Sequence, residues 1–299
     1  MNSTLAVLAV LDGISYAALV FLVSVGLSLI FGVLRVVNVA HGSLYAFGAY
    51  LAATFSLAIT PISPWLTYPA LLAASIVIGV LCGGFIERFL LRPLYGHEDV
   101  LQLLITFAAF MIMDNLQRLV WGVQPIFAAE PLRLLPNVTV FGVSYTSYQV
   151  ILLPAVALAT LFGLRYFLRR TLAGAVILAV TEDREASTAI GIDAERVYFV
   201  TFVIGASLAA LGGALASPTT SLVPGMGADM IVLSFAVAAT AGLGQIEGTA
   251  VTALMIGLTR AFVIYLQPEF EVLVPYLLMV LVLLVRPFGL FGAVHVRKI

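Results

Sequence analysis

Charged residues and cysteine are both scarce in this sequence. Asp, Glu, Lys and Arg make up 10% of its 299 residues and the formal net charge is −1, so nothing indicates a nucleic-acid partner. The single cysteine, Cys82, lies in an apolar run, which excludes a disulfide framework and a cysteine metal site. No group of His, Asp and Glu has metal-ligand spacing. We therefore expect neither a metal nor a cofactor.

Signatures of several other protein classes are missing as well. The first 34 residues contain no Lys or Arg, so the positive region of a cleavable signal peptide is not present. There is no phosphate-binding G-x-x-x-x-G-K-[ST] pattern, no Ser–His–Asp constellation, and no polar interval long enough to fold as an enzyme. We expect a chain that is not an enzyme. If ATP powers its action, a separate subunit must bind the nucleotide.

Apolar residues dominate what remains. Hydrophobic types make up 62% of the chain and the mean hydropathy is +1.14. One helical span of a bilayer takes roughly 20 apolar residues. The prediction is an all-α, polytopic transmembrane helical bundle of about eight or nine spans, forming a single domain over residues 1–299. The expected spans are about 8–33, 38–59, 68–90, 100–120, 148–167, 200–216, 230–241, 249–266 and 272–285, and whether 38–59 crosses or re-enters stays open.

The distribution of positive charge gives this bundle an orientation. With alternating spans, 11 of the 14 Lys and Arg residues fall on one side, which the positive-inside tendency assigns to the cytoplasm. Arg118 and Arg133 fall on the other side, and Arg260 falls within a span. We expect the N-terminus outside and the C-terminus in the cytoplasm. The inner set is Arg35, Arg88, Arg92, Arg165, Arg169, Arg170, Arg184, Arg196, Arg286, Arg297 and Lys298.

A charged segment at about 169–199 separates two apolar runs and belongs to the predicted cytoplasmic side. It contains the pattern of a short helix. Thr181 is the expected N-cap, Glu182 and Asp183 place negative charge in the first turn, and Gly191 follows the last turn. The helix body consists of small residues that a partner's groove can accept closely. This pattern favours a docking element, and an ordinary solvated loop is the alternative.

Two glycine-containing breaks interrupt the apolar runs, one in each half of the chain. The first contains Asn38, His41, Gly42 and Gly48. Non-helical backbone at membrane depth is tolerated where protein or water satisfies its polar groups, so we interpret this break as an element lining a pathway. The alternative is an interfacial turn in which His41 is wet. Transporters often build sites at such paired breaks.

The second break reads GLGQIEG, from Gly242 to Gly248, and includes Gly244 and Gln245. It is not a dinucleotide-binding fingerprint, because no strand precedes it and its spacing is wrong. A turn close to a gate and a plain interhelical loop are the two interpretations.

Few charges lie within the apolar runs, and such charges usually mark an ion path. The candidates are Asp12, Asp114, Glu247 and Arg260. Arg260 is expected deep in a span, where it needs a partner such as Glu247 or an acid on another helix. No chain of Asp, Glu and His follows one face, which argues against a proton-coupled carrier.

Several blocks of this sequence together resemble one family. They are NVAHGSLYAFGAYLA, AVTEDREASTAIGIDAERVYFVTFVIGASLAALGGALA, GLGQIEGTAVTALMIGL and the closing RPFGLFG, in this order over nearly the whole chain. The chain resembles the branched-chain amino acid ABC transporter permeases, the LivH-type inner-membrane subunit. The resemblance implies a second, LivM-type permease, two cytoplasmic ATPase subunits of the LivG and LivF type, and an external solute-binding protein in a prokaryote.

The resemblance also gives the charged segment a role. Its Glu-Ala-x-x-x-x-Gly pattern is similar to the EAA loop through which such permeases dock on their ATPases, although Glu-Ala-Ser replaces Glu-Ala-Ala and the downstream Ile-x-Leu-Pro is absent. The implied substrate is a branched-chain or related small amino acid. Two alternatives stay open. One is a permease of the same family for urea or short-chain amides, and the other, less favoured, is an ion-coupled secondary carrier. The implied coupling residues are Glu182, Asp183, Arg184, Glu185, Ala186, Gly191 and Ile192.

Overall fold

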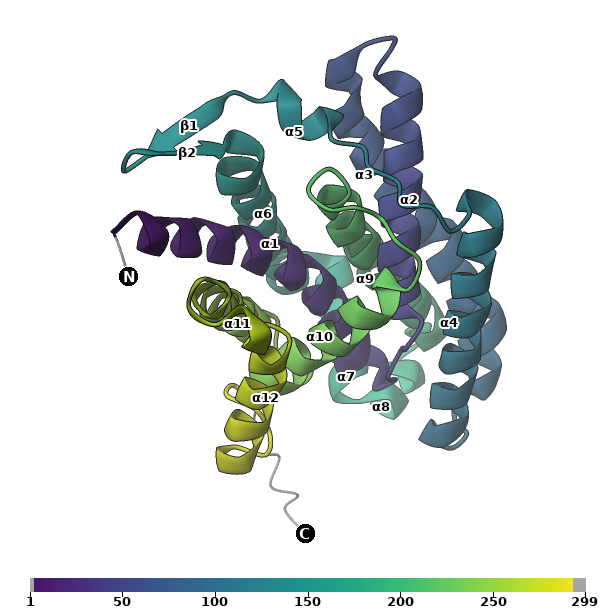
Figure 1. Cartoon of the computed structure of the whole chain (residues 1–299). Helices are drawn as coiled ribbons and strands as arrows, with labels where there is room; N and C mark the ends of the chain where they lie inside the picture. The colour runs from purple at the N-terminus through teal and green to yellow at the C-terminus, as the bar shows by residue number, and fades with distance from the viewer. Residues whose placement is uncertain (1–2, 293–299) are drawn as a thin grey trace.

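The computed structural model describes residues 3–292 as a bundle of helices arranged around α1 (Figure 1). The helices are α1 (Ser3–Leu34), α2 (His41–Ile59), α3 (Thr67–Ile78), α4 (Asp99–Trp121), α5 (Glu130–Leu134), α6 (Leu153–Arg170), α7 (Leu172–Glu182), α8 (Arg184–Ala189), α9 (Ala194–Ala216), α10 (Met226–Ala241), α11 (Ile246–Leu266) and α12 (Leu273–Val285). Short 3-10 or π-helical pieces extend some of them: η1 (Pro64–Leu66), η2 (Gly79–Gly83), η3 (Ile86–Leu91), η4 (Arg92–Leu94), η5 (Tyr148–Leu152) and η6 (Pro268–Phe270).

Seven of the helical segments in residues 3–292 are long and apolar enough to cross a membrane. This confirms the helical membrane bundle but gives fewer full-length spans than the eight or nine expected. The difference lies in the expected spans 230–241 and 272–285, because α10 has 16 residues and α12 has 13. Both are shorter than the roughly 20 residues that one span takes. The segments of full length are Thr4–Leu34, His41–Ile59, Pro64–Leu94, Asp99–Trp121, Tyr148–Arg170, Ala194–Ala216 and Ile246–Leu266.

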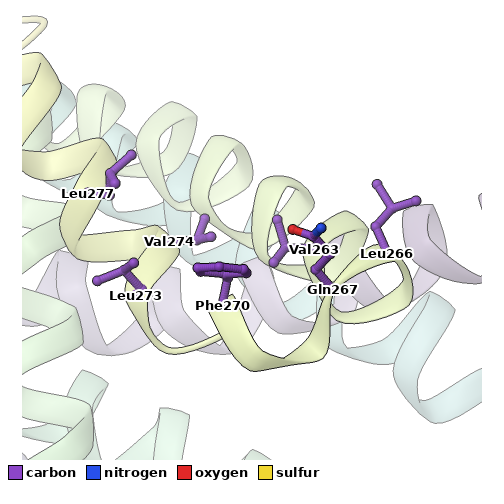
Figure 2. A pocket seen from close by; sticks show the side chains of 7 residues that line it. All are labelled: Val263, Leu266, Gln267, Phe270, Leu273, Val274 and Leu277. Carbon is purple, nitrogen blue, oxygen red and sulfur yellow. The ribbon is translucent and has the colours of Figure 1, made fainter.

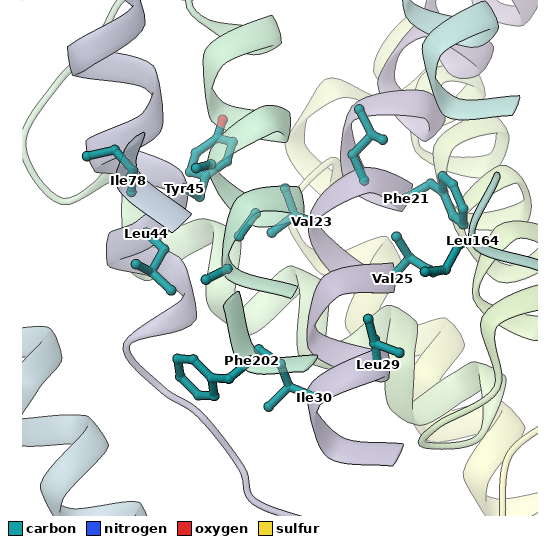
Figure 3. Close-up of a cluster of buried hydrophobic side chains, with 14 of the residues drawn as sticks. Phe21, Val23, Val25, Leu29, Ile30, Leu44, Tyr45, Ile78, Leu164 and Phe202 are labelled. Atoms are coloured by element: carbon teal, nitrogen blue, oxygen red, sulfur yellow. The ribbon is translucent and has the colours of Figure 1, made fainter. Parts of the chain in front are cut away.

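The core lies where α1 packs against α9 and α11, and where α2 packs against α9. In this core, Ile30 of α1 lies beside Phe202 of α9, and Phe21 of α1 lies beside Leu164 of α6 (Figure 3). Small residues allow close helix crossings. A side-chain carbon on Gly48 would lie 2.3 Å from the carbonyl oxygen of Ala210, for example.

The pair Gly79 and Gly83 shows the same packing between α3 with η2 and α9. A side-chain carbon on Gly79 would overlap Ser207, and one on Gly83 would overlap Ala206. This Gly-x-x-x-Gly pattern therefore packs helices inside the chain.

A β-hairpin departs from the all-α fold that the sequence predicts. Strand β1 (Asn137–Val140) pairs antiparallel with β2 (Val143–Thr146), and Val140 lies opposite Val143. The two turn residues, Phe141 and Gly142, both have positive φ, as a type I′ hairpin turn requires. No strand was predicted in this stretch, which lies between the expected spans 100–120 and 148–167. The hairpin and α5 lie at the end of the bundle opposite α7 and α8 (Figure 1).

The arginines gather at the end that carries α7 and α8, which we call the arginine end. Arg35, Arg165 and Arg169 lie around one cavity with the last turn of α7, and Arg92 pairs with Glu195 at the start of α9. This agrees with the predicted grouping of positive charge. Arg297 and Lys298 of that group lie outside the described residues.

Candidate functional site

The charged segment folds as two helices rather than one. The first, α7, was not predicted: it begins after Thr171, whose side-chain oxygen accepts a hydrogen bond from the Gly174 backbone N–H at 3.0 Å. Its Gly174, Ile177 and Val180 are buried. Gly174 lies so close to α6 that a side-chain carbon there would be 2.1 Å from the carbonyl oxygen of Phe167. The segment is thus anchored to the end of α6.

The second helix, α8, begins two residues later than expected. Its N-cap is Asp183, whose Oδ1 accepts from the Ala186 N–H at 2.9 Å. The expected N-cap, Thr181, instead lies in the last turn of α7, where its hydroxyl donates to the Ile177 carbonyl, and Glu182 ends α7. The prediction failed because α7 continues through Thr181. Glu185 is in the first turn of α8, where negative charge is favoured.

The end of α8 at Gly191 is confirmed in detail. Gly191 has φ +92, its N–H donates to the Thr188 carbonyl at 3.0 Å, and the Ile192 N–H donates to the Ser187 carbonyl at 3.0 Å. These two bonds form a Schellman motif, which terminates a helix with a left-handed glycine. A helix of only six residues depends on both of its caps, because short helices are marginal alone.

One face of α8 is held and the other is free. Ser187 is buried, and the Arg184 guanidinium lies 5.4 Å from the ring centre of Tyr198 on α9. Glu185 and Ala186 are exposed, and the side chain of Ile190 is 79% exposed. Ile190 was not among the residues predicted from the sequence. Its signal was a large apolar residue in the most charged part of the chain.

The first break in the apolar runs is narrower than expected and is buried. α1 ends at Leu34, Arg35 takes a left-handed φ of 56, and α2 starts at His41. Asn38 and His41 are fully buried, and a ring nitrogen of His41 bonds the Val23 carbonyl oxygen at 2.9 Å. The alternative of a wet interfacial His41 is therefore wrong.

Buried polar atoms without partners cluster along this break. Both side-chain polar atoms of Asn38 and Nδ1 of His41 lack a hydrogen bond in the described chain. Such groups usually find protein or water partners, because leaving them unpaired costs about 1–3 kcal/mol each. They place polar groups inside the bundle, and the pathway-lining role stays a prediction. Gly42 and Gly48, the other candidates here, instead lie at tight crossings with Gly227 of α10 and Ala210 of α9.

The second break is a turn, and the segment at 290–291 packs against it. Gly242 and Gly244 have φ +102 and +88, which L-residues rarely adopt. Gly248 lies against the ring of Phe291. The Leu290 and Phe291 N–H groups each donate at 2.9 Å to carbonyls in the last turn of α10. The RPFGLFG block therefore caps α10 and holds the turn in place.

The turn and the charged segment, which are far apart in the sequence, share one cavity of about 520 Å³. Gly244 and Gln245 form one wall and Glu182 another. Across it, the Glu247 carboxylate accepts from Arg169 at 2.9 Å and lies 3.5 Å from Arg165. The candidate gate turn is thus ionically joined to the helix, α6, that leads into the charged segment.

A buried carboxylate that the sequence analysis did not single out lies at the same end. Glu87 is fully buried, pairs with Arg92 at 3.2 Å and accepts from the Tyr95 hydroxyl at 3.1 Å. Burial, and then the nearby Glu87 carboxylate, raises the pKa of Tyr95, so this hydroxyl remains a donor. Arg92 also bonds Glu195, and the Tyr95 ring packs on Tyr198. These contacts tie the start of α9 to the corner before α4.

Among the intramembrane charges, Arg260 has the acidic partner that it was expected to need, but this partner is not Glu247. Arg260 lies in the last two turns of α11, pairs with Glu271, and places its guanidinium 4.0 Å from the Tyr16 ring centre. Glu247 is therefore not its partner. Asp12 accepts from Tyr145 and Tyr265.

Asp114, the remaining candidate, pairs with Arg118 one turn along α4 at 2.8 Å. The candidate charges thus have separate local partners.

Removing the Arg260 charge tests whether this pair is structural. Arg260→Met leaves the Glu271 carboxylate unpaired and should lower stability by about 1–3 kcal/mol. The double variant Arg260→Met/Glu271→Leu should recover most of that loss. The measurement is the thermal unfolding midpoint in detergent, with Arg118→Met as an exposed-pair control expected to change little. An ion-coupled carrier would instead lose transport in the double variant while remaining stable.

A second hollow, of about 540 Å³, lies between the end of α11 and α12 (Figure 2). Six of its seven lining side chains are apolar, among them Phe270 and Leu277, and Gln267 is the exception. It offers no charged group for a polar ligand.

The family model described as the branched-chain amino acid transport system permease component matches residues 9–283. The chain belongs to this family. Membership makes it a permease component of an ABC transporter in the inner membrane rather than an enzyme, which confirms the resemblance seen in the sequence.

Individual relatives align over almost the whole chain. It is 31% identical to the high-affinity branched-chain amino acid transport system permease protein BraD of Pseudomonas aeruginosa, with 96% of each chain covered. It is 28% identical to the permease protein LivH of Escherichia coli K12, again with 96% of each covered. A solved structure, PsaBC from Streptococcus pneumoniae in complex with Fab, aligns with 91% of this chain and 90% of that one at 13% identity and a TM-score of 0.48, which is too distant to argue from.

Proposed function

We propose that this permease forms one half of a translocation path for branched-chain amino acids and is driven by separate ATPase subunits that dock on α8. The observation that carries the proposal is α8 itself. It is closed at both ends by capping hydrogen bonds, held on one face against α9, and free on the face with Glu185 and Ile190. A rigid helix with a free face at the arginine end is what a docking lever requires.

The proposed orientation places the arginine end in the cytoplasm, as the positive-inside tendency favours. Closure of the ATPases would then move α8. Two connections would pass that motion inward. One is the Schellman motif at Gly191, which joins α8 to α9, and the other is α7, which is anchored on α6. From α6 the Glu247 ion pairs lead to the turn at Gly242–Gly248. The partners in this account are a second permease, two ATPases and an external solute-binding protein.

The substrate in this account comes from the relatives, whose printed names specify branched-chain amino acids. Buried polar atoms of Asn38 and His41 and the mixed charges of the cavity near Gln245 are compatible with a small zwitterion.

Co-purification tests the proposal. Tagged chain is purified in mild detergent from its native host and the accompanying proteins are identified. We expect two ATPases and a second permease. Ile190→Asp should remove the ATPases but keep the second permease, because it puts charge on the exposed apolar residue of the docking face. Phe141→Asp is the matched control, since Phe141 is 90% exposed at the hairpin tip at the other end. A chain that purifies alone and still transports would contradict the proposal.

A further inference from the structure

The cavity at the arginine end has two charged side chains that are not used by its own ion pairs. Glu247 is shared by Arg165 and Arg169, all three about half exposed. Arg35 and Glu182, which also line the cavity, take part in none of the ion pairs found in residues 3–292. One free cation and one free anion therefore face the same space.

Arg35 is held in an unusual backbone conformation. Its φ of 56 is in the left-handed region, which costs a non-glycine residue free energy. Its N–H donates to the Phe31 carbonyl at 2.9 Å, so it ends α1 in the place where glycine is usual. Backbone strain of this kind is concentrated at functional sites. Arginine occupies this position, although glycine adopts this conformation without strain.

The inner end of the cavity carries an unsatisfied hydroxyl. Ser28 is fully buried, lines the cavity, and its Oγ has no hydrogen-bond partner in the described chain. It precedes Arg35 by two turns of α1, about 10 Å along the axis. The lining of the cavity also includes apolar side chains, among them Leu29, Ile177 and Leu243. A buried hydroxyl is normally bonded to protein, water or ligand.

We propose that this cavity binds a small aliphatic amino acid in its zwitterionic form, with the carboxylate at Arg35, the ammonium group at Glu182 and the side chain against the apolar wall. A purely anionic ligand would be repelled by Glu182, and a neutral amide would use neither charge. The inference rests on the proposed function for the choice of amino acid. It adds a binding site in the permease itself, at the end where the transported molecule would leave.

Direct binding to the purified full chain in lipid nanodiscs, without other subunits, tests the inference. The probe is radiolabelled L-leucine, and the competitors are 4-methylpentanoate, which lacks the ammonium group, and 3-methylbutylamine, which lacks the carboxylate. Leucine should bind saturably, and each competitor should be at least about tenfold weaker, because each loses one charge-assisted contact. Inorganic phosphate should not compete.

Variants assign the two charges. Arg35→Gln should weaken leucine binding at least about tenfold and abolish the preference for leucine over 3-methylbutylamine. Glu182→Gln should do the same for the preference over 4-methylpentanoate. Ser28→Ala removes only the buried hydroxyl and should leave both preferences unchanged. Arg170→Gln, a neighbouring exposed arginine that does not line the cavity, is the matched control and should bind like the wild type.

Three results would overturn the inference: no saturable leucine binding, unchanged affinity in the folded Arg35→Gln variant, or displacement of leucine by phosphate. Each is separable from the proposed function. If the assembled transporter takes up leucine while the chain alone binds none, the cavity site is wrong and the transport proposal stands. If the chain binds leucine but recovers no ATPase on co-purification, the cavity site stands and the proposed ATPase docking is wrong.

Discussion

Replacing Gly191 with proline is expected to cut ATP-driven uptake by the assembled transporter at least about tenfold, while the chain still inserts and folds. Proline fixes φ near −65, whereas Gly191 has φ +92, and proline also removes the N–H that donates to the Thr188 carbonyl. The six-residue α8 would lose the motif that ends it. A loss of about 1.4 kcal/mol in docking free energy already lowers the docking equilibrium constant tenfold. Uptake into proteoliposomes and coupled ATP hydrolysis are the measurements.

The structure offers a closely matched control for this variant. Gly122 follows α4, has φ +79, and its N–H donates to the Arg118 carbonyl at 2.9 Å. Gly122→Pro therefore imposes the same backbone conflict and the same lost hydrogen bond at a different helix end. It should leave the coupling of ATP hydrolysis to uptake intact. Equal loss of coupling in both variants would show that the effect is general destabilisation rather than loss of the docking helix.

Gly48→Val should leave little correctly folded protein. A side-chain carbon at Gly48 would lie 2.3 Å from the Ala210 carbonyl oxygen and 2.5 Å from its Cα, so α2 and α9 must separate. Overpacking of this kind typically costs about 1–3 kcal/mol, and two rigid backbones place this site at the upper end. We expect a large drop in the monodisperse fraction on size-exclusion chromatography and a lower thermal midpoint.

Gly163→Val is the control for this second variant. Gly163 is also in the interior of a membrane helix, α6, but a side-chain carbon there meets nothing within 4 Å. The substitution is the same as at Gly48, but Gly163 faces no neighbouring helix backbone. If both variants are equally stable, the close crossing of α2 and α9 does not hold the bundle together as described.

The sequence predicts the parts of this fold that depend on local signals. Long apolar runs locate the full-length helices, and Gly191 predicts the end of α8 because a left-handed glycine is a local requirement. The N-cap was misplaced at Thr181 because α7 exists through its packing on α6, which no local pattern reports. The hairpin was missed because its Phe-Gly turn is not among the usual turn pairs.

The candidate site was less accessible from sequence, because its contacts join distant segments. Glu247 meets Arg169 across 78 positions, so its partner could not be chosen over Arg260 in advance. Glu87 was not singled out from the sequence, and only the packing of the fold shows that it is fully buried. Gly42 and Gly48 were read as pathway candidates, and only the facing backbones of α10 and α9 show what fills the space beside them.

Site-directed cross-linking from α8 tests the central claim most directly. In a Cys82→Ser background, Thr188→Cys places a single thiol on the exposed face of α8, and Ser144→Cys places one on the exposed hairpin. The account predicts that a short bifunctional reagent joins position 188 to an ATPase subunit in the co-expressed assembly, and that position 144 gives no such product. An ATPase adduct from position 144, or none from position 188 in an assembly that transports, would contradict it.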